Sequence, residues 1–353
     1  MKIRNKYFLA FKTRPAELKA VENLNPEVLT SIWPIIEITK GRSPKSLNKS
    51  LASLGNLFGN FPVTLDVTSE PRLSNPELDS LFNPYQGYAN WMTFLSSLKK
   101  EGFKNIYPTA LFNFEDSSFE KNIIEQIKSL ANLFKGVTYR LRIKDDGYKE
   151  DLNFFKVLPS DTELLVLLDA ENIIHSSGPL LIEKTSRILN YLIPNLPDDS
   201  TIVFIGSSFP KSISDFGDDE HDTFKLEEVE VFNELKEKYE INYGDYGSIC
   251  PLYRPQAGGN GWVPRIDVPL QDSVFYERTR RALPSISYAN AYEINAMKLI
   301  QDPRFPEITE RNWGLEQIRL AAENYAPGAS PSFWISVRMN IHIHTQLKRL
   351  RFV

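Results

Sequence analysis

Residues 7–11 read Tyr-Phe-Leu-Ala-Phe, and residues 32–38 read Ile-Trp-Pro-Ile-Ile-Glu-Ile. These two runs begin a series of short apolar segments that decides the fold. Segments that stay apolar along most of their length are typical of parallel strands, which are buried on both faces. Further segments of this kind are residues 62–67, 106–111, 137–143, 163–168, 201–205 and 241–246. The sequence therefore predicts eight strands.

Amphipathic segments separate these strands. The clearest is residues 119–134, where Phe119, Ile123, Ile127 and Leu130 recur at helical spacing and charged residues fill the other positions. Strands that alternate with helices predict a parallel sheet, because parallel neighbours need crossover connections. Eight such units favour a (β/α)8 TIM-like barrel over residues 1–250, with an open doubly wound sheet as the alternative. The first strand is not followed by Gly-x-Gly-x-x-Gly, which argues against a Rossmann dinucleotide site.

The character of the sequence changes after residue 250. Residues 251–271 are rich in Gly and Pro and predict a loop or hairpin, with a short strand at 263–268. Residues 272–353 predict a mainly helical C-terminal extension packed on the barrel, with helices over 288–301, 313–324 and 331–350.

The composition limits the classes of protein. A net charge of -4 gives no overall attraction to nucleic acid or to anionic membranes. Cys250 is the single cysteine, so an intramolecular disulfide is excluded and a reducing compartment is favoured. The chain has no apolar run of the roughly 18 residues that a membrane span needs, and its first apolar run is too short for a secretory signal. We therefore expect a cytoplasmic protein.

Several of these segments also carry a family resemblance. Tyr-Phe-Leu-Ala-Phe-Lys from Tyr7, Trp-Pro-Ile-Ile-Glu-Ile from Trp33, Gly-Asp-Tyr-Gly-Ser-Ile from Gly244 and Arg-Met-Asn-Ile-His-Ile-His from Arg338 resemble blocks of the phage-type "beta protein" family. The resemblance spans most of the chain. It implies a phage-related setting, with a role in antiviral defence or phage conflict. The implied partner is a phage protein or a defence-system protein.

Polar residues recur at the ends of the predicted strands. The C-terminal ends of barrel strands build the active site in this fold, so these residues are expected to meet at one rim. They are Lys12, Glu37, Asp66, Arg140, Arg142, Asp169, Asp245 and Tyr246. Buried charges need partners, and Lys12 with Glu37, or Arg140 with Asp169 or Asp245, are the expected pairs. A structural network of ion pairs is the alternative to a functional site.

The chemistry of this set suggests two reactions. Glu37, Asp66, Asp169 and Asp245 carry hard oxygen ligands suited to Mg2+, which is the candidate cofactor. Lys12, Arg140, Arg142 and Tyr246 would hold the substrate, and arginine is well suited to phosphate. The set therefore favours hydrolysis of a phosphoester or nucleotide, and acid–base cleavage of a glycoside by two carboxylates is the metal-free alternative. The sequence also leaves open a binding or sensor protein that recognises a phage protein, nucleic acid or a small signal, and an assembly subunit whose C-terminal helices form an oligomer.

Four other motifs are candidates for a functional role. On a helix, His342 and His344 point in different directions, which favours packing or capping roles over a shared metal. Ser207 and Ser208 follow a strand and are either phosphate donors or a plain loop. Gly258-Gly259-Asn260-Gly261, between Arg254 and Arg265, is a candidate phosphate loop or a plain turn. The basic end formed by Lys348, Arg349 and Arg351, with Trp334 and Arg338, is a candidate nucleic-acid contact or a solvated helix face.

Overall fold

The computed structural model describes residues 3, 5–212, 219–253, 261–280, 286–307 and 312–352, with the backbone alone at 44 and 45. Its main sheet holds eight parallel strands in the order β4-β3-β2-β1-β9-β7-β6-β5. The strands are β1 (Tyr7–Lys12), β2 (Ile32–Ile38), β3 (Pro62–Val67), β4 (Asn105–Pro108), β5 (Gly136–Arg142), β6 (Glu163–Asn172), β7 (Thr201–Ser207) and β9 (Asn242–Asp245).

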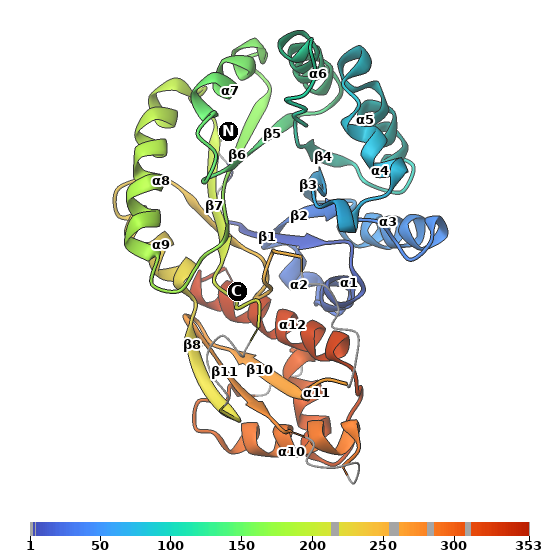
Figure 1. Cartoon of the computed structure of the whole chain (residues 1–353), viewed down its shortest axis with the longest axis vertical. Helices are drawn as coiled ribbons and strands as arrows, with labels where there is room; N and C mark the ends of the chain where they lie inside the picture. The colour runs from blue at the N-terminus through green and yellow to red at the C-terminus, as the bar shows by residue number, and fades with distance from the viewer. Residues whose placement is uncertain are drawn as a thin grey trace.

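The sheet curls into a ring whose two ends meet at β4 and β5 (Figure 1). Thr109 and Thr138 form a parallel bridge there, and the Ala110 amide donates to the carbonyl of Thr138 at 2.9 Å. The predicted (β/α)8 barrel is therefore confirmed.

The inside of the barrel is filled by every second residue of each strand. Phe8 and Ala10 of β1 pack there beside Trp33 and Ile35 of β2, whereas Tyr7 belongs to the core outside the ring. The next inward position on both strands is charged, because Lys12 follows Ala10 and Glu37 follows Ile35 by two residues. Strand alternation thus delivers charges to the C-terminal end of an apolar barrel.

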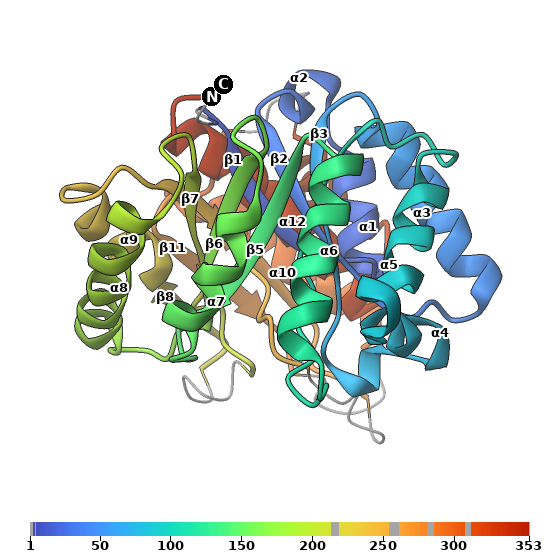
Figure 2. The ribbon, with the colours of Figure 1, turned by 90° about the horizontal axis from the view of Figure 1, so that it is seen from above.

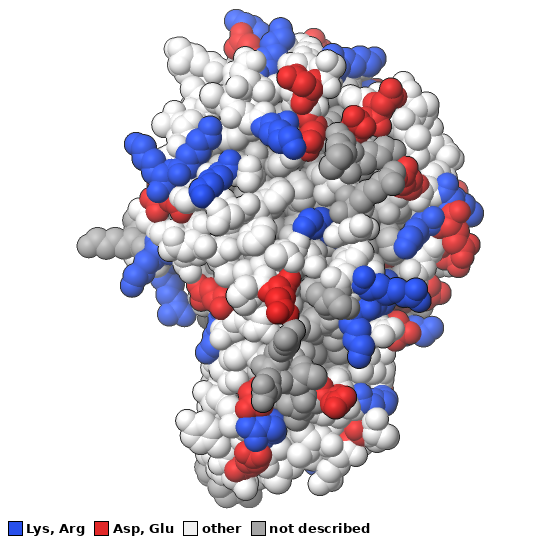
Figure 3. Space-filling model, turned by 180° about the vertical axis from the view of Figure 1, so that it is seen from behind, with Lys and Arg blue, Asp and Glu red and all other residues white. Residues whose placement is uncertain are grey.

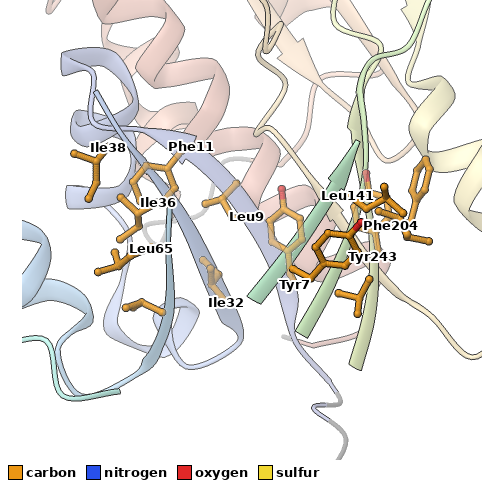
Figure 4. Packing of buried hydrophobic residues seen from close by; sticks show 14 of the residues in the cluster. Tyr7, Leu9, Phe11, Ile32, Ile36, Ile38, Leu65, Leu141, Phe204 and Tyr243 are labelled. Carbon is orange, nitrogen blue, oxygen red and sulfur yellow. The ribbon is translucent and has the colours of Figure 1, made fainter. Parts of the chain in front are cut away.

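Helices surround the strands on the outside (Figures 1 and 2). They are α1 (Pro15–Glu22), α2 (Pro26–Leu29), α3 (Pro44–Phe58), α4 (Pro76–Asp79), α5 (Tyr85–Leu98), α6 (Phe119–Leu133), α7 (Tyr148–Phe154), α8 (Gly178–Leu192) and α9 (Glu227–Lys236). Their apolar faces cover the outward-pointing strand residues, and part of this outer core is shown in Figure 4. Tyr7 and Tyr243 stack within it, with ring centres 6.0 Å apart.

A second, smaller unit lies against one side of the barrel (Figure 1). It has a three-stranded antiparallel sheet in the order β10-β11-β8, made of β8 (His221–Lys225), β10 (Arg265–Pro269) and β11 (Ser273–Arg278). Three helices complete it: α10 (Tyr288–Gln301), α11 (Trp313–Ala322) and α12 (Pro331–Arg349). The antiparallel pair of β10 and β11 lies across the boundary that we expected at residue 271.

Strand β8 was not predicted, and its composition explains why. It reads His-Asp-Thr-Phe-Lys, and only Phe224 is buried. Among the described residues it pairs with β11 alone, which makes it an edge strand of the three-stranded sheet. A mostly polar edge strand has no apolar run for sequence reasoning to detect.

Helix α12 joins the two units. Its Asn340 side chain donates to the carbonyl oxygens of Ala20 at 3.0 Å and Asn23 at 3.2 Å, on the barrel side. On the other side, its Arg338 binds the Asp267 carboxylate of β10 at 2.7 Å. Within the described part of the chain, no helix is both long and apolar enough to cross a membrane.

Candidate functional site at the barrel mouth

A pocket of about 450 Å³ opens at the C-terminal ends of the strands. Its floor holds Lys12, Glu37, Asp66, Arg140 and Tyr246, which are five of the residues predicted at the strand ends. They converge because the registers of neighbouring strands align them: Lys12 lies opposite Glu37, and Glu37 lies opposite Asp66. Three adjacent strands thus place charged groups at one level of the barrel.

Arg140 is the centre of this floor. Its Nη1 lies 2.6 Å from Asp66 Oδ2 and 3.2 Å from Glu37 Oε2. Its Nε donates to Asp169 Oδ2 at 2.8 Å, and its Nη2 lies 2.7 Å from both that oxygen and the Tyr246 hydroxyl. These contacts are four hydrogen bonds and one further ion-pair contact, so each of the three guanidinium nitrogens has a partner. Three carboxylates and a phenol therefore hold one buried cation, and the predicted Arg140–Asp169 pair is present.

Lys12 supplies the second cation of the floor. Its ammonium lies 3.7 Å from Glu37 Oε1, as predicted, and donates to the carbonyl of Pro251 at 3.2 Å. Glu17 approaches from α1 and accepts a hydrogen bond from the Lys12 backbone amide at 2.5 Å. Burial raises the pKa of Glu17 to about 6, and the positive charge of Lys12 only partly opposes this shift.

The environments of two neighbouring carboxyls push their pKa values in opposite directions. Burial disfavours ionisation of Glu37, but the charges of Lys12 and Arg140 outweigh it and hold the pKa of Glu37 below its ordinary value. Burial raises the pKa of Asp66, and Arg140 offsets only part of this effect. Both carboxylates contact the same Nη1 atom of Arg140, so they are direct neighbours. A base and an acid side by side can move protons to and from one substrate.

Above the floor, a rim carries both signs of charge. Arg142 Nε lies 3.3 Å from Glu171 Oε1, and Lys144 Nζ lies 2.7 Å from Glu171 Oε2. Arg142 also donates to the Ser69 hydroxyl across the pocket. Glu171 has a φ of 52°, a left-handed conformation that is uncommon for a residue with a side chain. The Glu171 carboxylate thus bridges two cations that line the pocket.

Aromatic rings form another part of the pocket wall. Phe112 packs between Tyr139 and Phe114, with ring centres 5.9 and 5.8 Å away, and Phe114 is 71% exposed. The Tyr139 hydroxyl donates to Asp151 Oδ2 at 2.9 Å. Burial raises the pKa of Asp151 to about 6, although this hydrogen bond lowers it. The pocket therefore has an apolar, ring-binding side and a charged side.

The carboxylates proposed as magnesium ligands are arranged around a guanidinium. Glu37, Asp66 and Asp169 all contact Arg140. Across the described residues, no group of three or more His, Cys, Asp or Glu side chains has the arrangement of a metal site. What the floor offers in this arrangement is proton transfer and charge.

Comparison with known proteins places the chain in a family. The sequence profile of the family described as "Beta protein" matches residues 7–348. The chain belongs to the Beta protein family. "Protein beta" of Enterobacteria phage P4 is 27% identical over 345 residues, which cover 97% of this chain and 93% of the phage protein.

Among solved structures, the chain matches a xylose isomerase-like TIM barrel/4-hydroxyphenylpyruvate dioxygenase fusion protein. It has a TM-score of 0.36 and 11% identity, and the match covers 72% of this chain and 40% of the fusion protein. The eight parallel strands of this Beta protein family member, in the order given above, themselves form the TIM barrel.

Asp245 lies apart from the mouth, although it was expected there with the other carboxylates. It is fully buried on the outer side of β9, where it accepts hydrogen bonds from the hydroxyls of Tyr7 and Tyr243. Its neighbour Tyr246 points into the barrel instead. Adjacent strand residues face opposite sides, so only one of the two reaches the pocket.

Several pocket residues were missed by sequence reasoning. Phe112 and Phe114 lie in an irregular segment after β4, and Lys144 and Glu171 lie beyond the predicted ends of their strands. The signal available for the last two was their spacing, because each lies two residues after a residue predicted for the site.

The structure shows where part of the four other motifs lies. Ser208 hydrogen-bonds Glu228 through both its amide at 2.9 Å and its hydroxyl at 2.5 Å, and neither Ser207 nor Ser208 lines the pocket. Trp334 and Arg338 are buried, so they are not on a solvated face. Arg254, Gly258, Gly259 and Asn260 lie outside the described residues, so the predicted phosphate loop stays a prediction.

Proposed function

We propose that the mouth of the barrel binds and hydrolyses a small ligand of the nucleotide type. The observation that carries this proposal is one pocket that is lined both by aromatic rings and by charged side chains. Its volume of about 450 Å³ falls in the range of small-molecule sites, roughly 300–1,000 Å³. Phe112 and Phe114 offer rings on which a base can stack. Lys12, Arg142 and Lys144 offer positive charge to a phosphoryl group.

The proposed reaction is hydrolysis with Glu37 as base and Asp66 as acid. Glu37 takes a proton from the attacking water, and Asp66, after it has taken up a proton from solvent, gives that proton to the oxygen of the bond that breaks. Arg140 positions both carboxylates by holding them at one nitrogen. The step consumes one water and releases two products. The carboxylate pair fits a phosphoester and the glycosidic bond of a nucleotide-type ligand alike, and product analysis distinguishes them.

Binding is tested by calorimetry with nucleoside monophosphates and nucleotide sugars. Phe114→Ala removes an exposed ring from the pocket wall, and Tyr85→Ala removes a similarly exposed ring that does not line the pocket. Loss of stacking is expected to weaken binding about tenfold in Phe114→Ala, whereas Tyr85→Ala should bind as the wild type does. Equal affinity in the wild type, Phe114→Ala and Tyr85→Ala would contradict stacking of the ligand on Phe114.

Turnover is tested by chromatography of the same ligands after incubation. Glu37→Gln and Asp66→Asn should lower the rate of hydrolysis by about 100-fold or more while affinity stays within about threefold. If both variants hydrolyse the ligand at the wild-type rate, the two carboxylates are structural.

A second candidate function is recognition without turnover. The observation that favours it is the complete set of protein partners around Arg140, which is typical of a rigid network rather than of a cation free to hold substrate. In this case the bound ligand is recovered unchanged. The phage-related family membership makes a phage or defence-system protein the proposed partner, and co-purification with and without phage infection tests it.

A further inference from the structure

A second cavity, of about 730 Å³, lies at the opposite end of the barrel from the mouth. It is bounded by the N-terminal ends of β7 and β9, by one side of α9 and by the end of α12. Residues 271 and 272, in the turn between β10 and β11, also border it. Its volume is again that of a small-molecule site.

The lining of this cavity is positively charged. The described residues around it include the cations Lys6, Lys236, Arg349 and Arg351, and the anions Glu240 and Asp272. This excess of cations contrasts with the net charge of -4 of the whole chain. On the face shown in Figure 3, by comparison, Lys and Arg are interspersed with Asp and Glu. A concentration of like charge in a concave site favours an anionic ligand.

Arg349 is the side chain that points most directly to a ligand. Its Nε donates to Gln346 Oε1 at 2.5 Å, and its guanidinium lies over the Tyr243 ring at 4.3 Å. These contacts hold the group in one orientation. Its Nη2 is buried and has no hydrogen-bond partner within the described part of the chain. A buried donor without an acceptor is destabilising. Arg349 also borders the cavity, where an anion would lie against its guanidinium.

We propose that this cavity binds a phosphorylated small molecule, whose phosphate group accepts hydrogen bonds from Arg349 and is further neutralised by Lys236 and Lys6. The site is separate from the barrel mouth. Tyr243 of β9 borders this cavity and Tyr246 borders the mouth pocket, which are three positions apart, or roughly 10 Å along a strand.

Pyrophosphate is the probe for this site, with binding measured by calorimetry on the full chain. We expect saturable binding of one pyrophosphate at this site. Arg349→Gln should weaken it about tenfold or more, because a charged hydrogen bond is lost, and Lys236→Gln should weaken it about threefold. Lys238→Gln, a matched change at an exposed lysine that lines neither pocket, should leave this affinity within about twofold. Lys236 is exposed on α9, so its variant remains informative if Arg349→Gln fails to fold.

Three results would overturn the proposal. The first is an absence of saturable binding below about 5 mM pyrophosphate in the wild type. The second is a loss of binding in Arg142→Gln as large as that in Arg349→Gln, which would assign the anion to the mouth. The third is tight binding of a single-stranded oligonucleotide that pyrophosphate does not displace, which would identify a nucleic-acid surface. None of these depends on turnover at the mouth, so the two proposals fail separately.

Discussion

The Nε2 atom of His342 lies 2.8 Å from Oδ2 of Asp245, and both side chains are completely buried. Asp245 belongs to β9 and His342 to α12, so this contact ties the C-terminal helix to the wall of the barrel. Burial disfavours ionisation of Asp245, but His342 and the surrounding donors outweigh it and hold the pKa of Asp245 below its ordinary value. The buried pair therefore joins the two units through a charged hydrogen bond.

The two histidines of α12 should respond oppositely to the same substitution. His342→Leu removes one hydrogen-bond partner of the buried Asp245 carboxylate, which keeps those of Tyr7 and Tyr243, and we expect a loss of about 1.5–3 kcal/mol in the free energy of unfolding. His344→Leu removes a ring whose Nε2 is buried without a partner in the described residues, so it should be neutral or stabilising. Urea denaturation at neutral pH measures both. A smaller loss of unfolding free energy in His342→Leu than in His344→Leu would contradict a stabilising role of the His342–Asp245 hydrogen bond.

His344 should also make stability depend on acid pH. Burial lowers the pKa of His344 to about 4 from an ordinary value of 6.5. The folded state therefore resists protonation, and the stabilisation is present above pH 6.5 and is lost as the pH falls toward 4. Between these values the wild type should lose up to about 3 kcal/mol more than His344→Leu. Equal pH dependence of the two proteins, measured by denaturant titration, would argue against this assignment.

The two arginines at the barrel mouth, Arg140 and Arg142, should differ in how much they contribute to the free energy of unfolding. Arg140→Met removes the cation that three carboxylates share, and it should cost about 3–5 kcal/mol. Arg142→Met removes a cation whose side chain is 36% exposed, so its cost should stay below about 1 kcal/mol. Thermal and urea melts of both variants provide the comparison. The expected order is reversed only if the Arg140 network contributes nothing to folding.

A single glycine should test how tightly the barrel interior is filled. A Cβ atom at Gly244 would lie 2.5 Å from Ile205 Cγ2 and 2.7 Å from the carbonyl oxygen of Phe8. Gly244→Ala therefore forces strands β7 and β1 apart, and we expect a loss of about 1–3 kcal/mol. Gly147→Ala is the control, because its nearest neighbour is 4.0 Å away. Similar melting temperatures for both variants would mean that the barrel adapts.

Glu228 should give the protein a stability that decreases toward alkaline pH. Burial raises the pKa of Glu228 from 4.5 to about 7, although Ser208 donates to it. A carboxyl with a raised pKa holds its proton more firmly in the folded state, so stability is lost as the pH rises from 4.5 through 7. Glu228→Gln should remove up to about 3 kcal/mol of this loss. The free energy of unfolding, followed from about pH 5 to about pH 8, should fall less in the variant than in the wild type.

The barrel and much of its floor were predictable from local pattern. Apolar runs mark the strands, and the charges at their ends meet because parallel strands bring their C-terminal ends to one face. Asp245 shows the limit of this reasoning. Asp245 adjoins Tyr246, and a strand directs only one of two adjacent side chains into the ring. An error of one residue in the predicted inward positions therefore assigns Asp245 to the pocket, although its side chain is buried on the outer side of the strand.

The sequence by itself determined the alternation of strands and helices, the helical character of α12 and part of the charged set at the barrel mouth, because these features follow from local periodicity. Tertiary structure alone decided that Arg140 is held by Glu37, which is 103 residues away, and that Arg349 faces a cavity beside α9. It also decided that the polar strand β8 pairs with β11. The physical reason is that burial and partner choice depend on contacts between distant segments, which no local pattern contains.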